Sequence, residues 1–226
     1  MKKNAKNIIA RSLTYFDYPI VINSYGRSGS TTLVKSIVRS VIEANNSQIP
    51  NIAFRSLYQE VWNLNDFRLR NGIVYKTHDY PPNAILNKKI RMIYTFANPV
   101  DVILSLQRQY ESKGEVWMKN HYEHLNVELT SFEKIIVEDQ LRLEKHLNTW
   151  LNFKQFPIAF VKYESMWKHI DEISEFVGFN VKLPDFKQRK AKELSGEKIR
   201  PEIRNTYASL IKKINELKPF FTNAEI

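Results

Sequence analysis

Apolar residues alternate along the chain between short continuous runs and longer stretches in which they recur every three or four positions. Continuous runs are typical of strands that are buried on both faces, as in a parallel sheet. The spaced stretches are typical of helices with one buried face. The predicted strands are residues 19–24, 72–76, 90–96 and 157–161. The predicted helices are residues 31–44, 100–110, 129–152, 164–177 and 201–218.

Glycine and proline refine this pattern. Gly178 is expected to end the helix before it, and Pro201 to begin the last helix. Residues 111–126 are aromatic and polar without a clear period, which predicts a mobile or substrate-facing segment, and residues 184–198 form a basic stretch with few structural signals. Because strands and helices alternate without repeats or a linker, the pattern predicts a single α/β domain with a central parallel sheet flanked by helices.

Composition narrows the possible partners. The chain has 226 residues, a formal net charge of +10 and no cysteine. The absence of cysteine excludes disulfides, cysteine-bound metals and thiol nucleophiles. A basic surface attracts nucleic acid, anionic lipid and phosphorylated small molecules alike. No RNA- or DNA-binding signature accompanies the charge, so we expect no stable nucleic-acid partner.

The lengths of the hydrophobic runs also bear on where in the cell the protein is expected. None approaches the roughly 20 residues that a membrane-spanning helix needs. The start of the chain is basic but continues with residues too polar for a signal peptide. We therefore expect a cytoplasmic protein without a transmembrane segment.

The strongest chemical signal lies between the first strand and its helix, where residues 25–32 read Tyr-Gly-Arg-Ser-Gly-Ser-Thr-Thr. Two glycines allow a tight turn with consecutive N–H groups, and the helix N-terminus adds partial positive charge. Arg27 adds a full charge and a planar fork for phosphate or sulfate oxygens. The pattern indicates an anion cradle, although an ordinary strand–helix turn has a similar composition. It is not a Walker A loop, because Ser30 and not lysine follows Gly29.

Residues 26–31 are similar to the 5′-phosphosulfate loop of sulfotransferases that use 3′-phosphoadenylyl sulfate (PAPS). Three more segments resemble motifs of that family in the family's order. They are Tyr-Lys-Thr-His at residues 75–78, the 3′-phosphate segment at residues 94–105 and the strand end near the adenine at residues 160–166. The motifs cover a core of about residues 19–180.

The resemblance implies a P-loop-like sulfotransferase domain over residues 1–226, with a C-terminal basic segment and helix at residues 185–218. It implies sulfuryl transfer from PAPS to a hydroxyl or amine of a small-molecule or glycan acceptor, with 3′,5′-adenosine bisphosphate (PAP) as product. We favour a carbohydrate or glycolipid acceptor.

The resemblance also assigns roles to residues. It implies that His78 is the general base, that Arg27 stabilises the departing phosphate, and that Lys76 assists. The implied donor-binding residues are Gly26, Arg27, Ser28, Gly29, Ser30, Thr31, Thr32, Ser105 and Tyr163. Residue chemistry agrees, because a histidine titrates near neutrality and can take a proton from an attacking hydroxyl. No metal is implied, since cations and backbone dipoles can stabilise the transferring oxygens.

Two departures from the family pattern stand out. Ala97 replaces the arginine that precedes Asn-Pro in the 3′-phosphate segment, and the distal Arg-Lys-Gly element is not recognisable. Basic residues could substitute, because phosphate accepts a well-placed cation. The candidates are Arg189, Lys190 and Lys192, or Lys198 and Arg200.

The remaining histidines and aromatic residues carry weaker signals. His121 and His124 have i, i+3 spacing but no third ligand, so we expect them to face solvent or the acceptor and not a metal. His146 and His169 are expected at the surface of helices. Tyr110, Trp117 and Tyr122 form either a sugar-stacking wall or ordinary packing.

Three alternatives to an active sulfotransferase stay open at this point. One is a P-loop phosphotransferase or small-molecule kinase. Another is a non-catalytic nucleotide- or nucleic-acid-binding module that uses the positive charge. The third is a sulfotransferase that has lost its donor site, as Ala97 suggests.

Overall fold

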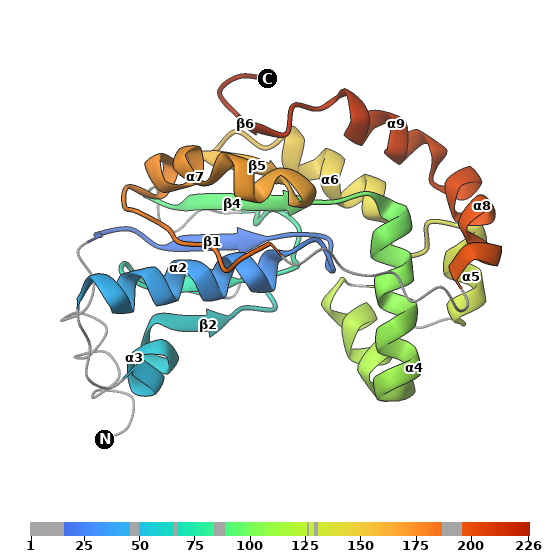
Figure 1. Ribbon diagram of the computed structural model, residues 1–226, viewed down its shortest axis with the longest axis horizontal. Coiled ribbons are helices and arrows are strands. Elements are labelled where there is room, and N and C mark those ends of the chain that lie inside the picture. The colour runs from blue at the N-terminus through green and yellow to red at the C-terminus, as the bar shows by residue number, and fades with distance from the viewer. Residues whose placement is uncertain are drawn as a thin grey trace.

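A computed structural model shows a sheet of mostly parallel strands with helices on both of its faces (Figure 1). It describes residues 16–45, 50–65, 67–83, 89–125, 127–128, 131–186 and 196–226. In the described residues the strands are β1 (Ile20–Asn23), β2 (Tyr58–Glu60), β3 (Val74–Lys76), β4 (Arg91–Phe96), β5 (Ile158–Lys162) and β6 (Phe220–Thr222). The predicted α/β fold is confirmed.

The sheet has the strand order β2-β3-β1-β4-β5-β6. Strands β1 to β5 run parallel, and β1 lies between β3 and β4, where Ile20 is opposite both Val74 and Arg91. All residues of β1 are buried, which agrees with its continuous apolar sequence. The carboxyl ends of the parallel strands meet at one edge of the sheet, where ligands of such folds usually bind.

The four predicted strands are all present, but the sheet has two more in its described part. Strand β2 pairs with β3, and β6 runs antiparallel to β5, so the sheet is not parallel throughout. Each of these two strands has three residues. A segment that short is too brief to show a period of two, which is why the sequence pattern missed both.

Helices cover both faces of the sheet. They are α2 (Ser30–Ala44), α3 (Pro50–Leu57), α4 (Pro99–His124), α5 (Phe132–Val137), α6 (Leu143–Leu151), the 3-10 helix η1 (Tyr163–His169), α7 (Ile170–Val177), α8 (Gly196–Thr206) and α9 (Ala208–Glu216). Helices α2 and α7 lie on the near face in Figure 1, whereas α6 packs behind the sheet, where Trp150 meets Tyr94. Helix α7 ends at Gly178 with φ of 78°, so the predicted end of this helix is confirmed.

Helix α4 includes most of residues 111–126, in which the sequence has no clear helical period. The predicted helix 100–110 continues to His124, and in Figure 1 it runs downward past the carboxyl edge of the sheet from the end of β4. It is broken at Gly114, which has φ of 74° and ψ of −172°. That backbone conformation is essentially confined to glycine. The break redirects the second half of α4.

The predicted helix 129–152 is in fact two helices, α5 and α6. The carboxylate of Asp139 accepts hydrogen bonds from the backbone N–H groups of Leu143 and Glu144, at 2.9 and 3.1 Å. A side-chain acceptor of this kind satisfies the first N–H groups of a helix and so starts a new one. The amphipathic spacing continued across the gap and hid the interruption.

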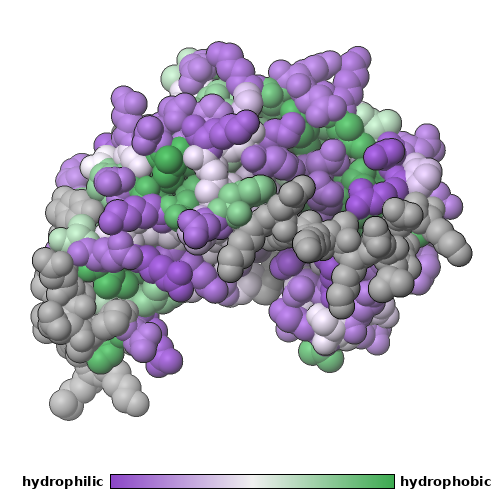
Figure 2. Space-filling view, in the orientation of Figure 1, coloured by the Kyte–Doolittle hydropathy of each residue, from purple (hydrophilic) through white to green (hydrophobic). Residues whose placement is uncertain are grey.

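The C-terminal residues join the same core. Pro201 lies inside α8, so the prediction that it begins a helix is wrong, and Tyr207 separates α8 from α9. The ring of Phe221 on β6 stacks on Phe160 of β5 at 4.8 Å. No helix in the described part of the chain is long and apolar enough to cross a membrane. On the face shown in Figure 2, hydrophilic residues cover most of the described surface.

Replacing Gly114 with alanine should test the break in α4. No heavy atom lies within 4 Å of the added Cβ, so the whole cost comes from the backbone. We expect urea unfolding to show a loss of about 1–3 kcal/mol. The control is Val116→Ala, at an exposed position on the same helix, which should change stability by less than about 0.5 kcal/mol. Equal losses of stability in the two variants would mean that the fold does not require the backbone conformation of Gly114.

Candidate active site

The chain turns from β1 into α2 through residues 25–29. Gly26, Arg27 and Gly29 all have left-handed backbone conformations, with φ of 91°, 55° and 87°. Turns of this kind point backbone N–H groups toward one concave side. Helix α2 then begins at Ser30 without a side-chain cap, so the N–H groups of its first turn remain available to an anion.

Three anchors hold this loop against β4. The Tyr25 hydroxyl donates to the Ala97 carbonyl and accepts from the Ala97 N–H, at 2.5 and 2.8 Å. The Ser28 hydroxyl donates to the Thr95 carbonyl at 2.9 Å. The ring of Tyr163, at the end of β5, packs under Gly29. Backbone groups at the end of β4 and the Tyr163 ring at the end of β5 therefore hold the loop in its shape.

Arg27 points away from these anchors and toward α4. Its Nε donates to the Ser105 hydroxyl at 3.0 Å. Ala97, where the family pattern has arginine, is buried, and its own backbone groups are bound to Tyr25. Arg189, Lys190 and Lys192 lie outside the described residues, as does the side chain of Lys198. The guanidinium that the described site places beside Ser105 is therefore that of Arg27.

His78 follows β3 and is buried. Its Nδ1 lies 2.7 Å from the Ser24 carbonyl, which can only accept a hydrogen bond, so Nδ1 carries the proton and Nε2 keeps the lone pair. Burial lowers the pKa of His78 well below its ordinary value, and the charge of Lys76 and the nearby His121 lower it further. The imidazole is therefore neutral at pH 7 and able to accept a proton.

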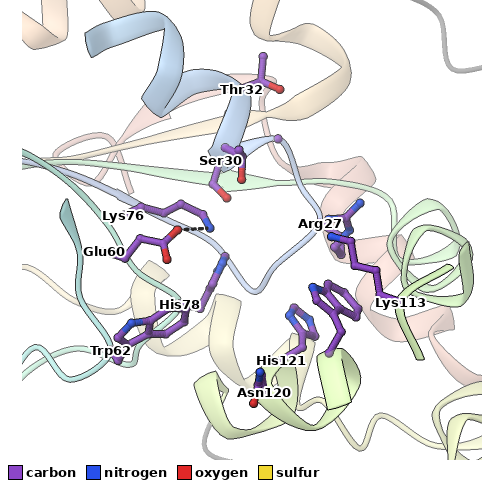
Figure 3. A pocket seen from close by; sticks show the side chains of 13 residues that line it. Arg27, Ser30, Thr32, Glu60, Trp62, Lys76, His78, Lys113, Asn120 and His121 are labelled. Atoms are coloured by element: carbon purple, nitrogen blue, oxygen red, sulfur yellow. Dashed lines mark hydrogen bonds and ion pairs between the residues drawn. The ribbon is translucent and has the colours of Figure 1, made fainter. Parts of the chain in front are cut away.

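Lys76 lies on β3 and forms an ion pair with Glu60 of β2, with 3.4 Å between Nζ and Oε1. The same carboxylate oxygen accepts a hydrogen bond from Tyr58 at 2.6 Å. The Lys76 side chain is 13% exposed, whereas that of Glu60 is 40% exposed. The pair places one cation and one carboxylate next to His78 (Figure 3).

The second half of α4 closes the other side. The rings of Trp117 and His121 stack at 5.3 Å, and the His121 ring lies 6.2 Å from that of His78. The cationic groups of Arg27 and Lys113 lie 5.9 and 5.3 Å from the Trp117 ring. Trp117 and His121 follow Gly114 in the chain, so the direction that α4 takes after its break carries both rings to the site.

These segments enclose a cavity of about 480 Å³ at the carboxyl edge of the sheet (Figure 3). Its lining includes seven residues that the sequence assigned to the site: Arg27, Gly29, Ser30, Thr31, Thr32, Lys76 and His78. It also includes Trp117 of the predicted aromatic stripe and His121. In Figure 3, His78 lies between Trp62 on one side and Asn120 and His121 on the other.

The profile of the sulfotransferase domain matches residues 17–225. The chain belongs to the sulfotransferase family. The predictions of a sulfotransferase and of PAPS as its donor are confirmed. A solved structure that the sulfotransferase resembles is mouse sulfotransferase SULT7A1 complexed with PAP, with 20% identity, 89% of this chain and 69% of that chain covered, and a TM-score of 0.46. No curated protein matches.

The donor-binding residues expected from the sequence do not all line the cavity of the sulfotransferase. Gly26 packs against the His121 ring, Ser28 turns its hydroxyl to β4, and Ser105 reaches the site through Arg27. Tyr163 lies beneath Gly29. The backbone N–H groups and the Arg27 cation suit a phosphate and a sulfuryl group, so the chemistry of the loop fits the donor.

Sequence reasoning missed four residues of the cavity: Glu60, Trp62, Lys113 and Asn120. Glu60 and Trp62 belong to the short strand β2 and the residues after it, which had no periodic signal. Lys113 and Asn120 lie in the segment that was predicted to face the substrate, but nothing in their spacing distinguished them. In the described residues no group of three or more His, Cys, Asp or Glu could hold a metal ion.

The prediction for His146 is wrong. This histidine is fully buried in α6, behind the backbone of His78. His169 is partly exposed and pairs with Glu172 at 2.8 Å. His146 lies on the buried face of α6 together with Leu143, Leu147 and Trp150, at the usual helical spacing, but a polar histidine gives no signal that it is buried.

The close approach of Gly29 to Tyr163 leads to a test. A Cβ at Gly29 would lie 2.1 Å from the Tyr163 ring, in a backbone conformation that alanine disfavours. We expect Gly29→Ala to weaken PAP binding about tenfold or more by calorimetry, because reshaping the loop costs more than about 1.4 kcal/mol. Gly72→Ala imposes the same backbone strain, at φ of 73°, away from the cavity. If both variants bind PAP normally, the loop shape is unimportant.

Proposed function

We propose that this sulfotransferase moves the sulfuryl group of PAPS to a hydroxyl or amine of a carbohydrate or glycolipid acceptor, with His78 as general base. The observation that carries the proposal is the neutral, buried imidazole of His78 in the same cavity as Arg27 and the first turn of α2. A proton acceptor and an anion cradle within one cavity are the two requirements of sulfuryl transfer to a hydroxyl.

In this proposal the loop holds the 5′-phosphosulfate. The donor-binding set is Gly26, Arg27, Ser28, Gly29, Ser30, Thr31, Thr32, Ser105 and Tyr163. Ser28 contributes its backbone N–H, since its hydroxyl is bound to Thr95. Ser105 orients Arg27 and offers its hydroxyl to the 3′-phosphate. Tyr163 supports the loop from below through Gly29.

The transfer step exchanges one bond to sulfur for another. The acceptor oxygen forms a bond to sulfur while the bond from sulfur to the bridging oxygen of the 5′-phosphate breaks. The electron pair of the broken bond stays on that oxygen, and PAP leaves. The proton of the acceptor hydroxyl moves to Nε2 of His78, whose Nδ1–H stays donated to the Ser24 carbonyl. Arg27 and the loop N–H groups stabilise the charge on the leaving phosphate, and Lys76 stabilises the sulfuryl oxygens.

The acceptor side of the cavity supports a carbohydrate. Trp62 and the stacked pair of Trp117 and His121 offer flat aromatic faces on two sides of His78. Such faces pack against the apolar side of a sugar ring. Asn120 and Glu60 add hydrogen-bonding groups for hydroxyls at the same opening.

Donor binding can be measured by calorimetry with PAP, and with ATP and Mg²⁺ in parallel. We expect micromolar binding of PAP that falls at least tenfold in Arg27→Ala, because the variant removes a charge-assisted contact worth about 1.5–3 kcal/mol. Arg39→Ala, at an exposed position later in α2, removes an equal charge outside the cavity and should bind PAP normally.

The alternatives to this function predict different results in the same experiment. Clear ATP binding without PAP binding would replace the proposal with a kinase. Binding of neither ligand would mean that the donor site has been lost. Nucleic-acid binding with a steep dependence on salt, unaffected by Arg27→Ala, would favour a binding module.

The acceptor can be sought by incubating the protein with PAPS and a panel of oligosaccharides, lipid-linked sugars, phenols and simple amines. We expect sulfated sugars, and we expect His78→Asn to lower kcat about 10²- to 10⁴-fold because the base is gone. Trp62→Ala should raise the acceptor KM and leave PAP affinity unchanged. Phe186→Ala, an exposed aromatic residue outside the cavity, is its control. Transfer to phenols but not to sugars would contradict the carbohydrate assignment.

A further inference from the structure

His146 has an unusual set of contacts for a histidine far from the cavity surface. It is fully buried, with its Nε2 3.1 Å from the carbonyl of His78 and 3.1 Å from that of Asp79. Its Nδ1 lies 2.7 Å from the Tyr94 hydroxyl. Because carbonyls only accept, Nε2 carries the proton, and Nδ1 then accepts from Tyr94. The contacts select one tautomer.

The backbone that follows His78 depends on side chains for support. The ladder between β1 and β3 ends where Thr77 N–H donates to the Ile22 carbonyl. Beyond that point, the Asp79 carbonyl accepts from His146, from Asn23 at 3.1 Å and from Trp150 at 3.0 Å. Donors from β1 and α6 thus converge on the peptide next to His78, at the position where the regular sheet no longer restrains it.

We propose that His146 is a positioning residue, which holds the backbone of His78 so that its imidazole keeps its place between the Ser24 carbonyl and the acceptor. Two hydrogen bonds then fix the base from opposite ends, one on its ring and one on its main chain. The inference rests on the proposed role of His78 as base. It assigns a reason for burying a histidine in α6.

The groups around both rings are consistent with this role. His78 faces Lys76, His121 and His146, and Lys76 is in turn paired with Glu60. His146 faces Tyr94, the Tyr80 ring at 4.8 Å, and Asp79. Burial lowers the pKa of His146 to about 4, so the ring stays neutral, in the tautomer that the two carbonyls require, throughout the physiological pH range.

The test compares His146→Leu with His146→Gln, whose amide N–H can still reach the carbonyls. Two quantities are measured in each variant: the pKa of His78 by NMR in the PAP complex, and kcat for conversion of PAPS to PAP with the acceptor panel. In the leucine variant we expect kcat to fall about 10- to 100-fold, since a displacement near 1 Å can cost that much. We also expect the His78 pKa to rise toward its ordinary value of about 6.5 as water enters. The glutamine variant should keep most of the original kcat and most of the lowering of the His78 pKa.

PAP affinity is the internal control, because a loosened base should leave the donor loop intact. His169→Leu replaces a partly exposed histidine outside the cavity and should change neither readout. If His146→Leu does not fold, Tyr94→Phe decides, and it should shift the His78 pKa in the same direction by a smaller amount.

Normal kcat and an unchanged His78 pKa in folded His146→Leu, or in Tyr94→Phe if His146→Leu does not fold, would overturn the inference. That result is distinguishable from failure of the proposed function. If His78→Asn keeps full activity, the base role is wrong whatever His146 does. If His78→Asn is inactive while the His146 variants are normal, only the positioning role fails.

Discussion

The hydrogen bond from the His78 ring to the Ser24 carbonyl joins the ends of two neighbouring parallel strands. One end continues into the left-handed turn that precedes α2, and the other carries the imidazole. Because β1 and β3 are held in register by their ladder, this bond sets the distance between the loop and the imidazole. In the proposed reaction the loop binds the donor while the imidazole takes the proton of the acceptor, so the proposed function depends on this contact.

Burial determines the charge of the site as much as its shape. His78 and His146 are both kept neutral by removal from water, and Lys76 reinforces the effect on His78. The fixed cations at the cavity are Arg27, Lys76 and Lys113, with the carboxylate of Glu60 beside Lys76. The excess of positive charge at the cavity favours an anionic donor, and burial keeps the imidazole of His78 neutral. The proposed reaction requires both.

The loop between β1 and α2 is held in place by hydrogen bonds at the end of β4. Tyr25 reaches across to Ala97 and occupies both backbone groups of the residue that stands in the place of the family's arginine. Arg27 meanwhile extends to Ser105 on α4. The guanidinium of Arg27 therefore connects the loop to Ser105. In the proposed function these two residues would bind the two phosphate ends of the donor, so the donor site links the loop to α4.

The sequence by itself determined the central strands, the loop of residues 25–32 and the order of its motifs, because these are local features: continuous apolar runs, glycines in a turn, and hydroxyl residues at a helix start. Only the tertiary structure decided that β6 runs antiparallel, that α4 breaks at Gly114 into the site, and that Glu60 and Trp62 join the cavity. It alone showed that the ring of His146 contacts the carbonyl of His78, 68 positions away in the chain. These features follow from contacts between distant segments, and periodicity along one segment contains no information about which distant backbone will lie against it.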